Sequence, residues 1–162
     1  MFKKSMYVLL ALSLFGCAAG SQLYTKDEEN AIMREMQSKA TPKLYLYAPT
    51  FLKFTKHSGE PFECALDGNA AGGIRLGDYV VVPVKPGDHT LICKQNVDGA
   101  GLATSSTNGS LAFKIEKNDL YIMVKNGLFT WSSLKLAASN TPPDNFSEEY
   151  ELSKTCAACA KN

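Results

Sequence analysis

The chain has 162 residues, of which 45% are apolar and 20% are charged, a composition typical of one globular domain with room for a tether. It carries 17 basic and 16 acidic residues, so no basic surplus is present to neutralise a nucleic-acid backbone. The only histidines are His57 and His89, which limits general-base and metal chemistry. We therefore predict no nucleic-acid partner, no cofactor, no metal site and no catalytic constellation.

The first 16 residues have the pattern of a secretory signal. Lys3 and Lys4 precede the apolar stretch Met6–Phe15, and small residues follow it. As a helix this stretch would be about 15 Å long, half the thickness of a bilayer core, so we do not expect it to be a permanent transmembrane helix. The pattern predicts export from the cytoplasm.

Leu14-Phe15-Gly16-Cys17 resembles the lipobox of bacterial lipoproteins, with Leu at −3, a small residue at −1 and the obligatory cysteine. The resemblance implies cleavage before Cys17 and a membrane anchor of acyl chains on it. Because Ala18 follows instead of Asp, it also implies outer-membrane delivery, facing the periplasm. Cleavage would leave 15 basic and 16 acidic residues, so the acyl chains must do the anchoring. The alternative is a plain signal peptide cut at a site such as Ala18-Ala19-Gly20.

Assigning Cys17 to lipid leaves an even number of cysteines for an oxidising compartment. Cys156 and Cys159 are close in sequence and are therefore expected to pair with each other, so we predict the disulfides Cys64–Cys93 and Cys156–Cys159. For the second pair, free or intermolecular thiols remain an alternative, and so does a redox or metal role. A redox pair would need a following helix and a zinc site would need two further ligands, which the sequence does not offer.

Residues 24–39 are predicted to form a short helix. Thr25 and Glu28 have the spacing of a capping box, and acidic residues fill the first turn. The apolar stripe, Ile32, Met33 and Met36, is thin. Two hypotheses remain open: a partly helical spacer that holds the domain off the bilayer, or a helix that packs on the domain or docks a partner.

From Lys43 to Ala137 the apolar period changes from helical to strand-like. About seven strands with short turns are indicated, and no crossover helices, which predicts an antiparallel β-sandwich of immunoglobulin-like or transthyretin-like type. Residues 98–110 are small and polar and indicate a long loop. Alternation predicts an inward-facing set: Phe62, Cys64, Leu66, Val82, Val84, Leu91, Cys93, Leu111, Phe113, Ile115, Leu120, Ile122 and Val124.

The tail Ser147–Ala160 has a helix-like pattern that would place Leu152, Cys156 and Cys159 on one face. We thus expect four parts: a lipoprotein signal peptide at 1–16, a lipid anchor and partly helical tether at 17–42, a β-sandwich at 43–138 and a C-terminal helical tail at 139–162.

The chain contains four stretches in a characteristic order: Leu44-Tyr45-Leu46-Tyr47-Ala48-Pro49, Ala65-Leu66-Asp67-Gly68, Gly77-Asp78-Tyr79-Val80-Val81-Val82 and Val84-Lys85-Pro86-Gly87-Asp88-His89-Thr90-Leu91. A later strand-like stretch is Asp119-Leu120-Tyr121-Ile122-Met123-Val124. Together they resemble a family of uncharacterised bacterial lipoproteins. The family is built on a small β-sandwich akin to PEGA and carboxypeptidase-regulatory-like domains. The resemblance covers about residues 43–125 and implies a fold and an envelope location, and it brings no catalytic residues.

The leading functional hypothesis is a lipid-anchored, non-catalytic binding or assembly module with an envelope-protein or cell-wall partner. Its contacts are expected on loops 49–61 and 98–110, with the aromatic residues Phe51, Phe54 and Trp131 as candidates. A small-ligand carrier or sensor is the second hypothesis, and a redox or metal accessory using Cys156 and Cys159 is the third. His89, Asp88 and Ser110 are the residue types of a catalytic triad, but any β-sandwich offers such combinations, so we predict that His89 is a packed, hydrogen-bonded residue. His57 is predicted to be a loop residue.

Overall fold

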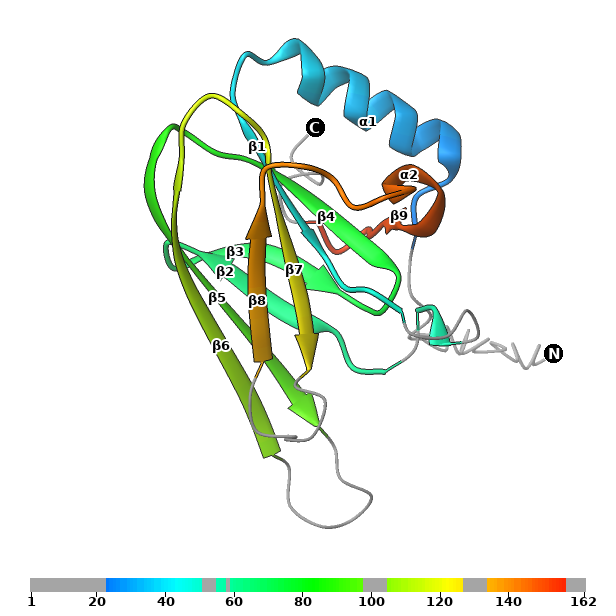
Figure 1. Ribbon diagram of the computed structural model, residues 1–162. Helices are drawn as coiled ribbons and strands as arrows, with labels where there is room; N and C mark the ends of the chain where they lie inside the picture. The colour runs from blue at the N-terminus through cyan, green and yellow to red at the C-terminus, as the bar shows by residue number, and fades with distance from the viewer. Residues whose placement is uncertain (1–22, 51–54, 58, 98–104, 127–133, 157–162) are drawn as a thin grey trace, which may run out of the picture.

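The computed structural model describes residues 23–50, 55–57, 59–97, 105–126 and 134–156, and all structural statements refer to them (Figure 1). The chain folds into two packed β-sheets, with one helix near each end of the described chain. The mainly β architecture predicted from the alternating pattern is confirmed. The elements in chain order are α1 (Lys26–Ser38), β1 (Lys43–Tyr47), β2 (Phe62–Leu66), β3 (Asn69–Ile74), β4 (Asp78–Pro83), β5 (Gly87–Val97), β6 (Ser105–Ile115), β7 (Leu120–Asn126), β8 (Leu134–Ser139), α2 (Phe146–Glu149) and β9 (Glu151–Leu152).

The two sheets have different pairing patterns. The four-stranded sheet, in the order β3-β2-β5-β6, is antiparallel throughout. The five-stranded sheet, in the order β8-β7-β1-β4-β9, is mixed, because β1 runs parallel to β7 and β4 runs parallel to β9. The prediction of an antiparallel sandwich missed these two pairings. Each joins strands far apart in the chain, and only local hairpins leave turn signals in a sequence.

Several predicted boundaries were wrong. The described residues form nine strands where the sequence indicated about seven. One of the additional strands is β3, whose residues Asn-Ala-Ala-Gly-Gly-Ile have low strand propensity. Residues 105–110, predicted as loop, extend β6 and pair with the end of β5. The predicted helix 147–160 is also wrong where described: α2 ends at Glu149, and Glu151–Leu152 form β9 because they pair with β4.

The core lies between the sheets, and the predicted inward set is found there. Ten of its members are buried, and Val82, Leu111 and Phe113 are partly buried against them. The strand β1 adds more than alternation predicts, since all five of its residues are buried. Leu44 and Leu46 share the inward side with their cross-strand partners on β4 and β7, so Tyr45 and Tyr47 face the outside of the sheet.

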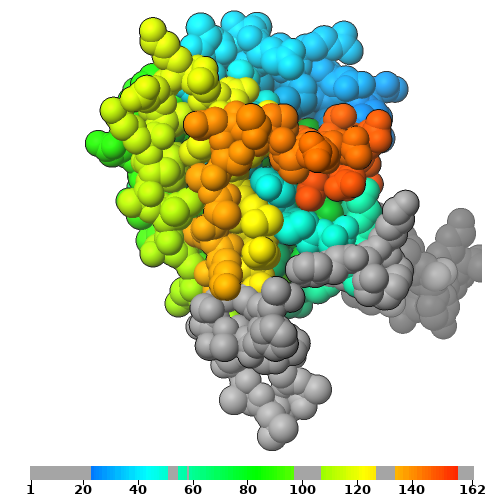
Figure 2. Space-filling view, in the orientation of Figure 1, coloured from blue at the N-terminus to red at the C-terminus, as the bar shows by residue number. Residues whose placement is uncertain are grey.

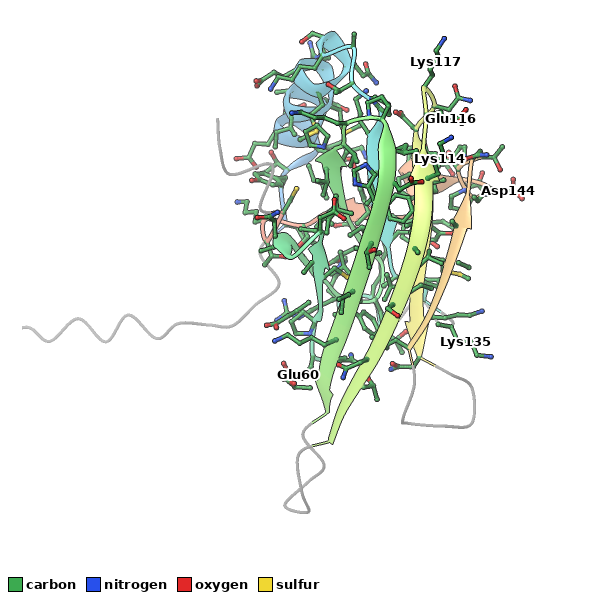
Figure 3. The ribbon with its side chains drawn as sticks, turned by 90° about the vertical axis from the view of Figure 1, so that its left-hand side faces the viewer. Glu60, Lys114, Glu116, Lys117, Lys135 and Asp144 are labelled. Atoms are coloured by element: carbon green, nitrogen blue, oxygen red, sulfur yellow. A yellow bond between two sulfur atoms is a disulfide. The ribbon has the colours of Figure 1, made fainter. Side chains whose placement is uncertain are left out.

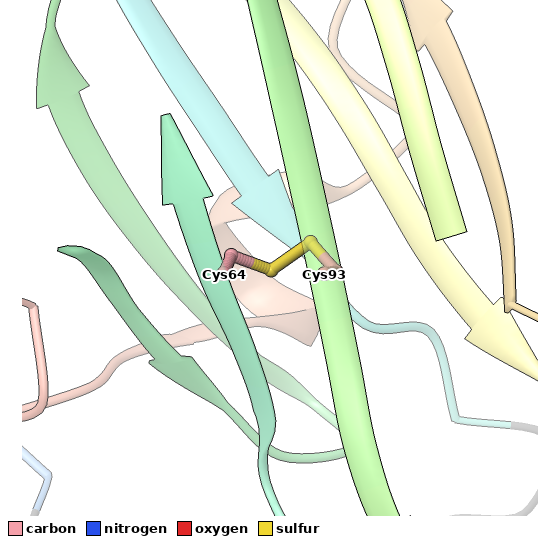
Figure 4. The surroundings of a disulfide bond; sticks show 2 residues. All are labelled: Cys64 and Cys93. Atoms are coloured by element: carbon pink, nitrogen blue, oxygen red, sulfur yellow. A yellow bond between two sulfur atoms is a disulfide. The ribbon is translucent and has the colours of Figure 1, made fainter. Parts of the chain in front are cut away.

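The predicted disulfide Cys64–Cys93 is present and joins β2 to β5 (Figure 4). The two residues are direct cross-strand partners with Cα atoms 4.1 Å apart, and both are buried. Cys156 is also buried and disulfide-bonded. Cys159 lies outside the described residues, so the pairing of Cys156 with Cys159 remains a prediction.

The segment from Tyr150 to Cys156 ties the two sheets together at one side of the sandwich. Glu151 and Leu152 pair with β4 of one sheet, and Cys156 bridges Gly72 on β3 of the other. The Thr155 hydroxyl donates to the Gly73 carbonyl oxygen. Gly72 has a φ of 134°, and a Cβ there would lie 2.8 Å from the Thr155 carbonyl oxygen. Only glycine permits this close approach.

The helix α1 is part of the folded domain. Its capping box is formed as predicted: the Thr25 side chain accepts from the Glu28 amide, and Glu28 accepts from the Thr25 amide. The Tyr79 hydroxyl of β4 donates to Glu29 at 2.8 Å, and both Glu29 and Met36 are buried. In Figure 1 the helix runs alongside β4. These contacts match the packing hypothesis for this helix and not the spacer hypothesis.

We expect replacement of both Cys64 and Cys93 by alanine to lower the free energy of unfolding by about 3–4 kcal/mol, because the bridge restricts the unfolded chain across a separation of 29 residues. Urea unfolding of the double variant beside the wild-type protein measures this loss. Equal stabilities would contradict it.

We expect Gly72→Ala to destabilise the fold more than Gly68→Ala. Both glycines have positive φ, but a Cβ at Gly68 meets nothing within 4 Å. Gly68→Ala should cost about 1–2 kcal/mol for backbone strain alone. Gly72→Ala should cost about 3 kcal/mol or more, because Thr155 must also move. Urea unfolding compares the two, and similar costs would mean that the C-terminal segment does not press on β3.

Candidate functional site

The outer face of the five-stranded sheet is aromatic and is covered by the chain itself. The ring of Phe146 on α2 lies 5.1–5.9 Å from the rings of Tyr45, Tyr47, Tyr79, Tyr121 and Tyr150, measured between centroids. Figure 2 shows the C-terminal segment in orange lying across this face, with β1 in cyan beneath it. Burial raises the pKa of the Tyr150 hydroxyl to about 12, and raises those of Tyr45 and Tyr79 as well. This face is a second, external core rather than an open site.

The outer face of the four-stranded sheet is not covered by any other described segment of the chain. One row of residues runs across all four strands without a charge: Ala70, Ala65, Ile92 and Ser110, which are cross-strand neighbours in that order. Ile92 is 50% exposed and is the one large apolar side chain found exposed among the described residues. Cys64 and Cys93, next to Ala65 and Ile92 in sequence, face the core, so the disulfide lies directly behind the row.

Charged residues border this uncharged row. On one side, Glu63 and Lys94 are cross-strand partners and form an ion pair with a 3.0 Å separation between Lys94 Nζ and Glu63 Oε2. On the other side, beyond Thr90 and Ala112, Asp88 lies opposite Lys114. The face thus has an uncharged centre and a charged margin, and many protein interfaces likewise have a less polar centre and a polar rim.

His89 is a packed and hydrogen-bonded residue, as predicted. Its Nδ1 lies 2.7 Å from Asp67 Oδ2 and its Nε2 lies 2.8 Å from the Lys85 carbonyl oxygen. Both partners are acceptors, so both ring nitrogens donate when the ring is protonated, and the hydrogen bond to Asp67 raises the pKa of His89. Ser110 lies beside Ile92 on the outer face of the sheet, whereas His89 is on the inner face. The residues His89, Asp88 and Ser110 therefore do not form a triad.

His57 has partners that the sequence did not indicate. Its Nδ1 lies 2.5 Å from Oδ1 of Asp78, which is only 1% exposed, and its Nε2 lies 3.6 Å from Glu151 Oε1. Lys56 donates to the same Glu151 oxygen at 2.9 Å and lowers the pKa of that carboxyl. Burial raises the pKa of Asp78. The cluster joins the 55–57 turn to β4 and β9. Because these segments are distant in sequence, the contacts of His57 could not be predicted from it.

This histidine cluster resembles part of a catalytic triad but does not have its geometry. A general base needs one ring nitrogen bound to a carboxylate and the other directed at a nucleophile or substrate. In His57 a carboxylate faces each ring nitrogen. The arrangement fits a structural role in which these bonds hold the 55–57 turn against the C-terminal segment.

Other predicted site residues lie outside the described residues: Cys17, Phe51, Phe54, Trp131, Cys159 and most of the loop 98–110. Among the described residues, no three His, Cys, Asp or Glu side chains lie together so as to hold a metal ion. No helix in the described chain is long and apolar enough to cross a membrane. The redox, metal and small-ligand hypotheses stay predictions.

Comparison with protein families, with curated proteins and with solved structures finds no match to this chain.

We expect the contribution of His89 to stability to depend on pH. Its pKa is raised in the folded state, so its stabilising effect is complete below the ordinary histidine pKa of about 6.5 and is lost as the pH rises through the folded-state pKa. The pKa of Asp67 is lowered, so its effect is lost only in acid. The difference in unfolding free energy between wild type and His89→Gln should be largest near pH 5 and smaller at pH 9.

Urea unfolding at pH 5, 7 and 9 measures this difference, with the exposed Lys117→Gln as the control variant. A difference that stays constant across the series would show that His89 does not fold as a charged partner of Asp67.

Proposed function

We propose that this protein is a lipid-anchored envelope lipoprotein whose disulfide-stapled β-sandwich acts as a non-catalytic binding or assembly module. We further propose that it binds a protein partner through the outer face of the β3-β2-β5-β6 sheet. The membrane anchor would be the acyl chains on Cys17, in the outer membrane facing the periplasm, which the Leu14-Phe15-Gly16-Cys17 lipobox supports.

The observation that carries the proposal is the contrast between the two outer faces. The five-stranded sheet is covered by Phe146 and Tyr150 from its own chain. The four-stranded sheet has no such cover within the described residues, and its centre is the uncharged row around Ile92. Burying the exposed half of an isoleucine side chain would contribute about 1 kcal/mol to binding, and the small neighbours let a flat partner approach closely.

Rigidity also supports a binding role for this face. Ala65 and Ile92 stand on the two strands that the Cys64–Cys93 bridge joins. A surface that is already ordered loses little conformational entropy when it binds. The histidines support a non-catalytic role, because carboxylate or carbonyl oxygens face both ring nitrogens of each.

The test is photo-cross-linking in intact cells of the native host. A photoreactive amino acid at Ser110, the cross-strand neighbour of Ile92, should give a discrete adduct with an envelope protein. Adding Ile92→Lys should abolish the adduct, because it places a charge in the uncharged row. The control is Ala137→Lys on β8, an exposed residue of the other sheet, which should leave the adduct unchanged.

Western blotting of the membrane fraction shows whether each variant is made at the wild-type level. Loss of the adduct in both lysine variants, or its survival in Ile92→Lys, would contradict binding through this face.

A further inference from the structure

We infer that the corner formed by Leu23, the first turn of α1 and Ser153–Thr155 faces the lipid bilayer. We also infer that the domain is held there by the shortness of its tether. This inference rests on the proposed anchor at Cys17. It names the surface that meets the membrane, which the anchor alone leaves open.

The folded domain begins soon after the anchor. Leu23 forms an antiparallel bridge with Ser153, and the Tyr24 amide donates to the Leu152 carbonyl oxygen at 3.2 Å. The ammonium group of Lys154 lies over the Tyr24 ring, 5.6 Å from its centroid. The start of the domain is therefore fixed to the C-terminal segment, which is itself paired with both sheets.

The helix α1 cannot serve as a reserve of tether. It starts three residues after Leu23, its first turn is closed by the Thr25–Glu28 capping box, and its buried Glu29 accepts from the Tyr79 hydroxyl. Unwinding it would expose Met36 and would leave Glu29 and Tyr79 without this bond. The spacer that the sequence suggested over residues 24–39 is thus part of the domain.

Covalent geometry then limits where the domain can lie. Cys17 and Leu23 are six residues apart, and a fully extended chain of that length spans about 20 Å. A domain of this size has a radius of gyration of about 14 Å and a diameter of more than about 30 Å. Because the tether is shorter than the domain is wide, the side opposite Leu23 cannot turn toward the bilayer.

The opposite side can be identified in the fold. In Figure 1 the turn between β6 and β7 lies across the molecule from the start of α1. Lys114 and Lys117 lie at this turn (Figure 3) and are exposed. Near the anchor, Lys26 and Lys154 are exposed as well. The native chain thus has exposed lysines on both sides of the domain, and their reactivity can show which side lies against the bilayer without any added residue.

The experiment is amine footprinting of the native lipoprotein on phosphatidylcholine vesicles, with a membrane-impermeant acetylating reagent and mass spectrometry of each lysine. The comparison is a variant with about twenty Gly and Ser residues inserted between Ser21 and Gln22, whose reach exceeds the width of the domain. We expect Lys26 and Lys154 to react several-fold more slowly with the native tether than with the long one. Lys117 should react equally in both.

The protection should persist at high salt, because it comes from covalent reach and not from attraction to headgroups. Equal rates at Lys26 and Lys154 with both tethers, or protection of Lys117, would overturn the inference while leaving the anchor intact. The intact mass of the same preparation separates the two ideas. A mass without acyl chains on Cys17 would overturn the anchor, and this inference with it.

Discussion

The complete burial of β1 is the constraint on which the rest of the structure depends. Leu44 and Leu46 fill the space between the sheets, and Tyr45 and Tyr47 point away from it, yet all are buried. A strand without an exposed face needs cover on both sides. The second cover comes from Phe146 and Tyr150, which the chain brings back over the outer face after β8. The Tyr45 and Tyr121 rings, stacked at 4.6 Å, complete this external core.

The same returning segment closes the sandwich. After crossing the aromatic face it pairs with β4, receives the bridge from Leu23 and reaches Gly72 on the other sheet. The His57–Asp78 pair and the Glu151–Lys56 bond hold the 55–57 turn against this C-terminal segment. Both ends of the described chain thus meet at one corner. The contacts that stabilise this corner are also the ones from which we propose the orientation of the domain at the membrane.

The two outer faces of the sandwich differ in whether the described chain covers them. The outer face of the five-stranded sheet is covered by internal packing, because the rings of Phe146 and five tyrosines bury one another there. The other keeps small residues and Ile92 exposed above a disulfide. A surface that is uncharged at its centre and has a disulfide behind it suits the proposed protein partner, because an ordered surface loses little conformational entropy on binding. We therefore propose binding through a face of a sheet, and parts of the loops 49–61 and 98–110, which the sequence favours as contacts, lie outside the described residues.

The sequence by itself determined what depends on neighbouring residues. The capping box at Thr25, the alternation from Phe62 to Leu66 and the parity that turns Cys64 and Cys93 to the core are short-range patterns, so they could be predicted. Only the tertiary structure decided the parallel pairing of β1 with β7, the strand identity of Glu151–Leu152 and the placing of His57 against Asp78. These contacts join residues 21 to 76 positions apart in the chain, and their energy comes from burial that exists only once the sheets have packed.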